Sequence, residues 1–399
     1  MKRALLLAGL FALAACSQAR APPAGSTDLA AQKLSTAADD RALEVAAYPG
    51  SGAVYALTDA YSSGDNTGEG GSDVFLRRYN RSGSVVWTRK LGDEAYNSAN
   101  ALATDGGGNL VVSYNDRLEK RRADGSVVWS RTVQNVSALA TDKSGNVYVG
   151  GGNESADAYL RKYTGSGSPL WTRSLVPTRG IAAYPTGIAT DAGGNVYTAV
   201  RDVDDCCLWS TLVKHSPSGQ RLFSKPFTEG ELDNAFSMES VAVQGNALYV
   251  AGTLHANWGG DLDRPYAVDG LLIKTSLGGS EQWRRVFGTP GYDSVNDLAA
   301  DPSGGLYLTG YTLGNMGGAQ PGGSDVFLRK YTSGGSAVWT KQIGSSGDDA
   351  GNAVFAYSSG ELYLAGEAGG ALQGGTHRGG QDAFLRRTDG AGNRVWTDQ

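Results

Sequence analysis

The sequence Asp325-Val-Phe-Leu-Arg-Lys-Tyr331, followed by a Trp-Thr pair that begins at Trp339, decides the fold because the chain repeats it. Close copies begin at Asp73, Asp157 and Asp382, and each of them is also followed by a Trp-Thr pair. Weaker copies keep the aromatic residue, which recurs at seven positions: Trp87, Trp129, Trp171, Phe223, Trp283, Trp339 and Trp396. The mean spacing of about 52 residues is typical of folds that repeat one supersecondary unit.

A second phrase precedes each copy and predicts the strands of the unit. Residues 101–105 and 109–113 are apolar-alternating runs around a Gly-rich turn, and equivalents recur at 138–149, 187–197, 241–250 and 298–308. A Ser-Gly-Ser-type turn joins the last two runs, so each unit reads as four antiparallel strands, which we name a, b, c and d. Seven such units fill residues 42–397.

One four-stranded sheet cannot cover both of its own faces, whereas blades packed radially cover each other. We therefore expect an all-β fold, a seven-bladed β-propeller of four-stranded antiparallel blades that spans residues 41–399. The Trp or Phe of strand d is expected to pack between blades. A parallel β-helix or an open solenoid is the alternative, although repeats in those folds are usually shorter.

Composition and charge narrow the class of protein. Glycine supplies 58 of 399 residues, about double its usual share, which favours many tight turns. Low-complexity disorder would also be rich in glycine, but the regular placement of Trp and aliphatic residues argues against it. The net charge of −5, without basic clusters, makes nucleic acid a poor candidate partner.

The first forty residues indicate export and tethering. Lys2 and Arg3 precede an apolar run over residues 4–12 that is too short for a permanent membrane span. The following Leu13-Ala-Ala-Cys16 resembles the lipobox of bacterial lipoproteins, which implies removal of residues 1–15 and lipidation of Cys16. An ordinary signal peptide with a chance cysteine is the alternative.

Residues 16–40 then form the lipidated cysteine and a flexible tether rich in Ala, Ser, Pro and Gln. We expect a lipid-anchored protein of the cell envelope. Ser17 follows the cysteine in place of Asp, which implies the outer membrane if the organism has one and follows the usual sorting rule.

The repeats resemble the SBBP (seven-bladed β-propeller) repeat family of bacterial surface proteins. The resemblance rests on residues 325–331, 338–340, 343–349 and 361–366 and extends over nearly the whole mature chain. It departs most at residues 117–120 and 211–214, where the usual Asp-x-Phe-Leu is absent. The resemblance implies a propeller fold and an envelope location, with no shared catalytic residues. A weaker resemblance, limited to the c–d turns, connects the chain to quinoprotein-like propeller lipoproteins.

Strand alternation places the a–b and c–d turns on one side of the ring and the b–c and d–a loops on the other. The turns are short, whereas the b–c loops expected at 62–72, 202–210, 254–269, 313–324 and 368–381 are long and varied. Variable loops on a repeated scaffold usually carry binding surfaces, so the loop side is the predicted functional face.

Three d–a loops share a glycine followed eight residues later by Asn100, Asn296 or Asn352. Five residues after two of these glycines come Asp293 and Asp349, and Asn97 takes this position in the remaining loop. These polar groups could line the channel mouth and hold a cation or a polar ligand. Alternatively, they stabilise the loops by accepting backbone hydrogen bonds. Their recurrence in several blades favours this structural role.

Two loops break the repeat. The blade-5 loop contains His255, Trp258, Asp261 and Asp263, together with Arg264 and Tyr266, and this mixture suits sugar or peptide binding; a simple surface loop is the alternative. The blade-4 loop contains Cys206 and Cys207, which could form a strained vicinal disulfide in an oxidising envelope or stay as two thiols.

The function predicted from the sequence is a non-catalytic interaction module. The three histidines lie in different blades without metal-ligand spacing, and no nucleophile elbow or phosphate loop is present. We expect no cofactor and no catalytic or metal site, and no specific motif supports a bound Ca²⁺. The expected partner is an envelope protein or surface polymer. A glycan-, small-ligand- or cation-binding propeller and, less favoured, a propeller hydrolase or lyase remain the alternatives.

Overall fold

The computed structural model describes residue 34 and residues 39–48, 50–62, 71–92, 96–152, 158–175, 182–203, 208–227, 235–256, 267–318, 322–357 and 360–399. These residues form seven four-stranded sheets, and each sheet uses four consecutive strands of the chain in their chain order. Every neighbouring pair is antiparallel.

The strands of blades 1 to 4 are β1 (Asp40–Tyr48), β2 (Ala53–Ser62), β3 (Gly71–Tyr79), β4 (Val85–Leu91); β5 (Ala99–Thr104), β6 (Leu110–Tyr114), β7 (Arg117–Arg121), β8 (Val127–Thr132); β9 (Val136–Thr141), β10 (Val147–Gly151), β11 (Tyr159–Tyr163), β12 (Pro169–Ser174); and β13 (Ala182–Thr190), β14 (Val196–Val203), β15 (Leu208–His215), β16 (Arg221–Phe227). Those of blades 5 to 7 are β17 (Ala235–Gln244), β18 (Ala247–Ala256), β19 (Ala267–Ser276), β20 (Glu281–Phe287); β21 (Asp293–Ala300), β22 (Gly305–Thr312), β23 (Asp325–Thr332), β24 (Ala337–Ile343); and β25 (Asp349–Ala356), β26 (Leu362–Ala368), β27 (Asp382–Thr388), β28 (Arg394–Asp398).

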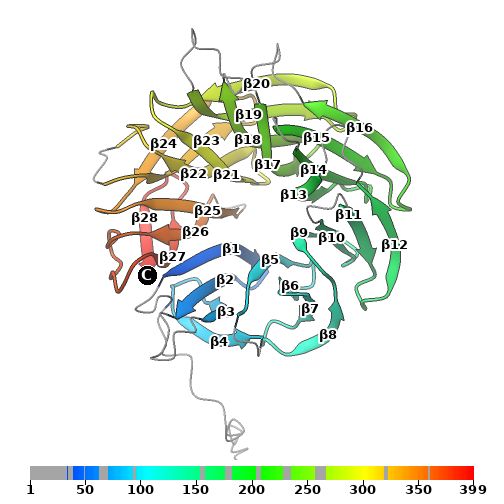
Figure 1. Ribbon diagram of the computed structural model, residues 1–399, viewed down its shortest axis with the longest axis horizontal. Helices are drawn as coiled ribbons and strands as arrows, with labels where there is room; N and C mark the ends of the chain where they lie inside the picture. The colour runs from blue at the N-terminus through cyan, green and yellow to red at the C-terminus, as the bar shows by residue number, and fades with distance from the viewer. Residues whose placement is uncertain are drawn as a thin grey trace, which may run out of the picture.

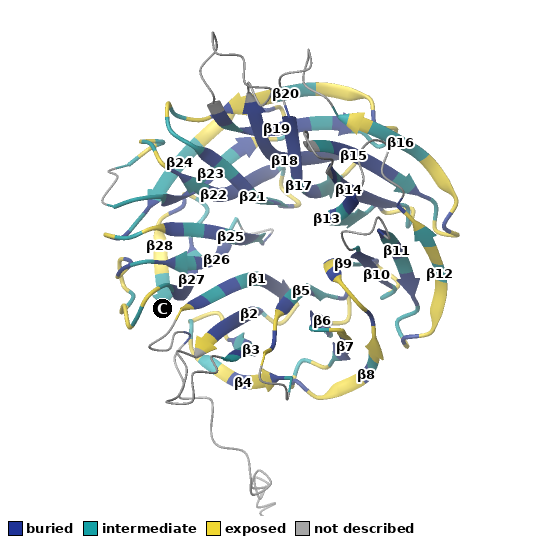
Figure 2. Ribbon diagram, viewed as in Figure 1, coloured by how far each residue is buried: buried dark blue, intermediate teal, exposed yellow. Residues whose placement is uncertain are grey.

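The seven sheets stand around a central axis, with the first strand of each blade innermost and the fourth on the rim (Figure 1). The predicted seven-bladed β-propeller is therefore confirmed. Burial is greatest in the second strand of each blade, such as β6, β10 and β22, and exposed residues gather on the outermost strands (Figure 2). Within the described residues, no helix is long and apolar enough to cross a membrane.

An aspartate organises the a–b turn in four of the blades. The Asp142 carboxylate accepts hydrogen bonds from the backbone N–H groups of Ser144 and Asn146 and from the Asn146 side chain, at 2.8–3.0 Å. Asp105, Asp191 and Asp301 hold their turns in the same way. This is the local reason why the Asp-x-x-Gly-Asn pattern marks a turn between two strands.

The strand-d aromatic residue joins each blade to the next. A Cβ added to the left-handed glycine in the following blade's c–d turn would lie 2.8–3.0 Å from this ring at six of the seven junctions, and 3.4 Å at the junction of Trp87 with Gly125. Only glycine therefore fits beneath the ring at those six junctions, as in the contact of Trp129 with Gly167. Four indole N–H groups also donate to the same turn at 3.0–3.2 Å, those of Trp87, Trp129, Trp171 and Trp396. The predicted packing of these aromatics between blades is confirmed.

Among the described residues, no strand is exchanged between the first and last blades, and the ring is closed by side-chain contacts and by a backbone hydrogen bond from the Asp40 N–H to the Gln381 carbonyl at 2.6 Å. The Trp396 indole of blade 7 lies over Gly83 of blade 1 and donates to the Arg81 carbonyl at 3.2 Å. The Glu361 carboxylate pairs with the guanidinium groups of both Arg81 and Arg387 at 2.5 Å. Closure thus repeats the contact used at every other junction and adds an ion-pair cluster.

Candidate binding surface

Each innermost strand carries a β-bulge at an equivalent position. The pairing with strand b skips one residue in every blade, and the skipped residues are Leu43, Asn100, Ser137, Thr186, Glu239, Asn296 and Asn352. Bulges re-aim a side chain away from the regular ladder. Five of the seven bulged residues line a cavity of about 220 Å³ on the axis of the ring, to which every blade contributes.

Four bulged residues link neighbouring blades. Each donates to the carbonyl that precedes the bulge of the next blade, as Asn296 does to Gly351 at 2.9 Å and Asn352 to Ala42 at 3.1 Å. Ser137 and Thr186 make the same bond to Pro185 and Met238, both at 2.6 Å. The belt is interrupted where the bulged residue is Leu43, Asn100 or Glu239.

The channel wall is acidic. Glu44, Glu239 and Asp297 line it without any Lys, Arg or His. Asp297 accepts hydrogen bonds from Ser240, Leu298 and Val354, so its carboxylate also ties three blades together. No described residue donates a hydrogen bond to Glu44, and burial, reinforced by the charge of Asp297, raises its pKa well above the usual value. Burial likewise raises the pKa of Asp297.

A second cavity, of about 340 Å³, opens on the loop face between blades 6 and 7. Its apolar wall comes from Tyr311 and Leu313, and Leu313 is 48% exposed. Its polar wall comes from Asp348, Asp349 and Glu367, and no basic residue lines it. We name this site the 6/7 pocket.

The acids of the 6/7 pocket differ in their surroundings. Burial, reinforced by the neighbouring charge of Asp325, raises the pKa of Asp349 to about 6 against the opposing hydrogen bonds from Ser345. Burial also raises the pKa of Glu367. Asp348 is exposed and accepts from the Ser324 N–H at 2.9 Å. A cationic group entering the pocket would therefore meet one solvated and two partly desolvated carboxylates.

An aromatic row leads to this pocket across the loop face. Tyr292 and Tyr311 stack with ring centroids 5.9 Å apart and an angle of 5° between their planes. His255 meets Tyr292 edge-on at 6.5 Å, and burial lowers the pKa of this histidine, which favours the neutral imidazole. The row lies beside carboxylates, an arrangement suited to a side chain that is apolar along its stem and positive at its tip.

The sequence between strands b and c and between strands d and a contains 15 acidic and 3 basic residues, whereas the a–b and c–d turns contain 7 and 3. Of those 15 acids, Asp116 and Asp348 lie among the described residues.

The structure corrects the predicted positions of several site residues. Asn100, Asn296 and Asn352 lie in strands β5, β21 and β25, not in the d–a loops, because the ladder continues through the bulge. Asp293 and Asp349 are the first residues of β21 and β25 and are buried. Both carboxylates accept backbone hydrogen bonds from the preceding loop, Asp293 from Thr289 and Asp349 from Ser345.

Four of the five predicted b–c loops are shorter in the structure, and those predicted at 62–72 and 368–381 become 63–70 and 369–381. His255 lies in β18, where it pairs with Val268 of β19, so the blade-5 connection is 257–266 and not 254–269. The blade-4 connection is 204–207 and not 202–210, because Asp202 pairs with Trp209. The strands therefore continue through the polar residues Asp202 and His255, which the sequence analysis assigned to loops.

Several predicted residues lie outside the described part of the chain. These are Cys16, Cys206, Cys207, Trp258, Asp261, Asp263, Arg264 and Tyr266. Among the described residues, the predicted candidates do not form one site, since His255 lies beside Tyr292, Asp349 lies in the 6/7 pocket, and Asn296 and Asn352 line the channel. Within the described ranges, no group of three or more His, Cys, Asp or Glu could hold a metal ion.

Sequence reasoning missed the channel acids and most of the 6/7 pocket. The bulge that turns Glu239 toward the axis leaves no sequence signature, since the residue types at the seven bulges differ. The sequence did contain a signal for Tyr311 and Leu313. They lie where a strand ends and a Gly-rich loop begins, a position where polar residues are expected.

The fold defines the class of this protein as a closed seven-bladed β-propeller. Residues 282–316, which run from β20 to just beyond β22, match a family model described as SBBP, a β-propeller repeat. Residues 282–316 therefore carry one SBBP repeat, in agreement with the predicted resemblance. The matched segment begins in the outer strand of blade 5 and continues into blade 6, so this stretch spans the junction between two blades.

Solved structures share the architecture at low sequence identity. Sqt1 from Chaetomium thermophilum aligns with a TM-score of 0.53 and 14% identity over 92% of this chain and 90% of its own. A puromycin hydrolase S511A mutant complexed with PGG aligns with a TM-score of 0.53 and 12% identity over 89% of this chain and 53% of its own. BamB from Moraxella catarrhalis aligns with a TM-score of 0.45 and 14% identity over 81% and 82% of the two chains. The first two support the propeller fold and nothing finer. No curated protein matches the sequence.

Proposed function

We propose that this protein is a lipid-anchored, non-catalytic interaction module of the cell envelope that binds a basic segment of a partner protein on its loop face. The observation that carries the proposal is the 6/7 pocket, where three carboxylates face Tyr311 and the exposed Leu313 and no basic residue lines the cavity. Anchoring through Cys16 would hold the ring at the membrane, and the tether would leave the loop face free to meet its partner.

The chemistry of the pocket selects the partner. A Lys or Arg side chain would place its methylene stem against Tyr311 and Leu313 and its charge among Asp348, Asp349 and Glu367. The carboxylates of the 6/7 pocket would attract a positively charged group toward this point. Binding should therefore weaken as the salt concentration rises.

The test uses the full-length lipoprotein, crosslinked in intact cells, extracted in mild detergent and identified with its partner by mass spectrometry. The variant combines Asp348→Asn with Glu367→Gln, which removes two charges from the pocket and preserves side-chain size. The matched control combines Asp124→Asn with Asp389→Asn, two acids in c–d turns on the opposite face, of which Asp124 is exposed and Asp389 is partly exposed.

A stoichiometric basic partner that is retained by the control and lost from the pocket variant would support the proposal. Equal recovery from both variants would place the interface elsewhere. Recovery of the unmodified protein alone would overturn the interaction role.

A further inference from the structure

The carboxylate of the a–b turn aspartate also contacts side chains of strands b and c in its own blade. In blade 2, the Asp105 carboxylate lies 2.8 Å from the Lys120 ammonium of strand c. In blade 3, Asp142 lies 3.8 Å from Lys162 and accepts from the Tyr148 hydroxyl at 3.2 Å. The hydroxyl groups of Tyr197 and Tyr307 donate in the same way to Asp191 and Asp301 in blades 4 and 6. A carboxylate therefore fills the space beside the strand-b tyrosine and the strand-c lysine.

Blade 5 lacks this carboxylate. Val243 pairs with Leu248 in blade 5, as Thr141 pairs with Val147 in blade 3. The a–b turn of blade 5 is therefore one residue shorter than that of blade 3, and Gln244 occupies the position of Asp142. The Gln244 amide turns away and donates to the Asp301 carbonyl of blade 6. Tyr249 and Lys274, the equivalents of Tyr148 and Lys162, remain in place without an acid.

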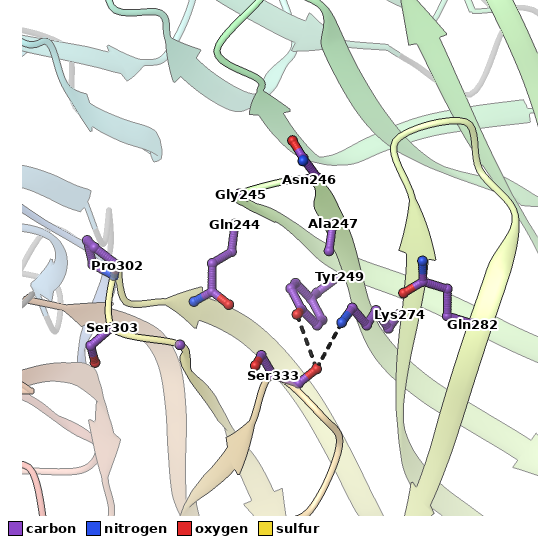
Figure 3. Close-up of a pocket in the computed structure, with 11 residues that line it drawn as sticks. Gln244, Gly245, Asn246, Ala247, Tyr249, Lys274, Gln282, Pro302, Ser303 and Ser333 are labelled. Atoms are coloured by element: carbon purple, nitrogen blue, oxygen red, sulfur yellow. Dashed lines mark hydrogen bonds between the residues drawn. The ribbon is translucent and has the colours of Figure 1, made fainter.

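A cavity of about 490 Å³ occupies the vacated space on the turn face, between blades 5 and 6. Lys274 and Tyr249 converge on the Ser333 carbonyl at 3.1 and 3.3 Å, and Gln244 and Gln282 flank them on either side (Figure 3). The Lys274 ammonium lies 5.6 Å from the centre of the Tyr249 ring. No acidic residue lines the cavity, so the ammonium can offer its remaining N–H donors to a ligand.

A second departure from the repeat faces the same cavity. The residue before the strand-d aromatic is Val or Leu in six blades, and these side chains are 42–52% exposed on the rim: Val86, Val128, Leu170, Leu222, Val338 and Val395. In blade 5 this residue is Gln282, which lines the cavity. Blade 5 therefore lacks the turn aspartate and has the amide of Gln282 in place of an aliphatic side chain, and both changes lie at the same cavity.

The other two blades without the turn aspartate do not leave such a space open. In blade 1, the Tyr48 ring fills the turn, where it packs against Gly50 and Gly108. In blade 7, Glu361 supplies the carboxylate and pairs with Arg387, the equivalent of Lys274. Among the described turns, blade 5 alone combines a retained lysine and tyrosine with a cavity of this size.

We propose that the cavity between blades 5 and 6 binds a carboxylate ligand, whose anionic group takes the place of the turn aspartate. Lys274 would form the charge-assisted hydrogen bond, and the amide groups of Gln282 and Asn246 would supply further donors. The volume suits a small organic acid, and it also admits an acidic side chain or the C-terminus of a protein. This site is separate from the loop face and does not depend on the proposed partner there.

Calorimetric titration of the detergent-solubilised full-length protein tests the proposal with two probes. Succinate represents a free small carboxylate, and a synthetic pentapeptide ending in Glu-Asp represents the carboxylate of a protein. We expect saturable binding of at least one probe at one site per chain. Binding of succinate would identify a small-molecule site, whereas binding of the peptide alone would identify a docking site for a protein terminus.

Three variants locate the site. Lys274→Met keeps the side-chain length and removes the charge, and it should weaken binding at least ten-fold. Gln244→Glu places a carboxylate of the protein itself at the wall of the cavity and should weaken binding to a similar degree. Lys214→Met is the matched control, because Lys214 is the blade-4 equivalent and donates to the Leu277 carbonyl, and this variant should bind as the unmodified protein does.

Thermal unfolding of each variant shows whether it is folded before titration. Failure of both probes to bind the unmodified protein would overturn the proposal. Binding that survives Lys274→Met, or that Lys214→Met weakens equally, would also overturn it.

Discussion

The contact of Trp396 with Gly83 is expected to hold the first and last blades together, and an alanine at position 83 tests it. Gly83 has a φ of 91°, and an added Cβ would lie 2.8 Å from the indole Cδ2. A left-handed alanine costs about 1–2 kcal/mol, and overpacking costs about 1–3 kcal/mol more. Gly83→Ala should therefore lower the free energy of unfolding by about 2–5 kcal/mol.

Two other glycines separate backbone strain from the lost contact. Gly145 and Gly304 have φ values of 75° and 106°, which bracket that of Gly83, and an added Cβ would have no neighbour closer than 3.8 Å. Alanine at either position should cost only the left-handed strain, about 1–2 kcal/mol. Urea unfolding followed by tryptophan fluorescence measures all three variants under the same conditions. Equal destabilisation by the three substitutions would refute the assignment of ring closure to this contact.

Three further predictions concern buried acids and the anchor. The pKa of Glu44 is raised in the folded state, so folding takes up a proton and stability falls as pH rises above about 4.5, by up to about 1.4 kcal/mol per pH unit. Glu44→Gln should remove this loss and stabilise the protein at pH 7 but not at pH 4, as measured by urea unfolding at both values; equal effects at both would contradict the assignment. The same reasoning applies to Asp349, whose pKa is about 6, so Asp349→Asn should flatten the stability profile between about pH 4 and pH 6. An unchanged slope in urea unfolding across that range would oppose it. Cys16→Ser should move the protein from the membrane fraction to the soluble extract on cell fractionation, and persistence in the membrane would show that Cys16 is not the anchor.

Much of the architecture was predictable because the propeller repeats local signals. The seven strand-d aromatics fix the number of blades, and the Asp-x-x-Gly-Asn pattern fixes the a–b turns, since the carboxylate of Asp142 bonds the backbone of its own turn. The glycine beneath Trp129 follows from the same repeat, as Gly167 is the left-handed residue of a Ser-Gly-Ser turn.

The candidate site was less predictable because its residues meet only through tertiary structure. The bulges that turn Glu239 and Asn296 inward depend on pairing with the second strand, and the 6/7 pocket joins Tyr311, Asp349 and Glu367 from three different strands. The blade-5 cavity did leave a signal. Alignment of the repeats would show Gln244 and Gln282 replacing an aspartate and an aliphatic residue.

The central claim is that the loop face is the surface that meets a protein partner. Site-specific photo-crosslinking in intact cells tests it most directly, with the crosslinking amino acid placed at Leu313 or at Leu222. Both leucines are 48% exposed, but Leu313 lies at the 6/7 pocket and Leu222 lies in outer strand β16. We expect one dominant protein adduct from position 313, weakened by high salt, and none from position 222. The same adduct from both positions, or an adduct from position 222 alone, would contradict the claim.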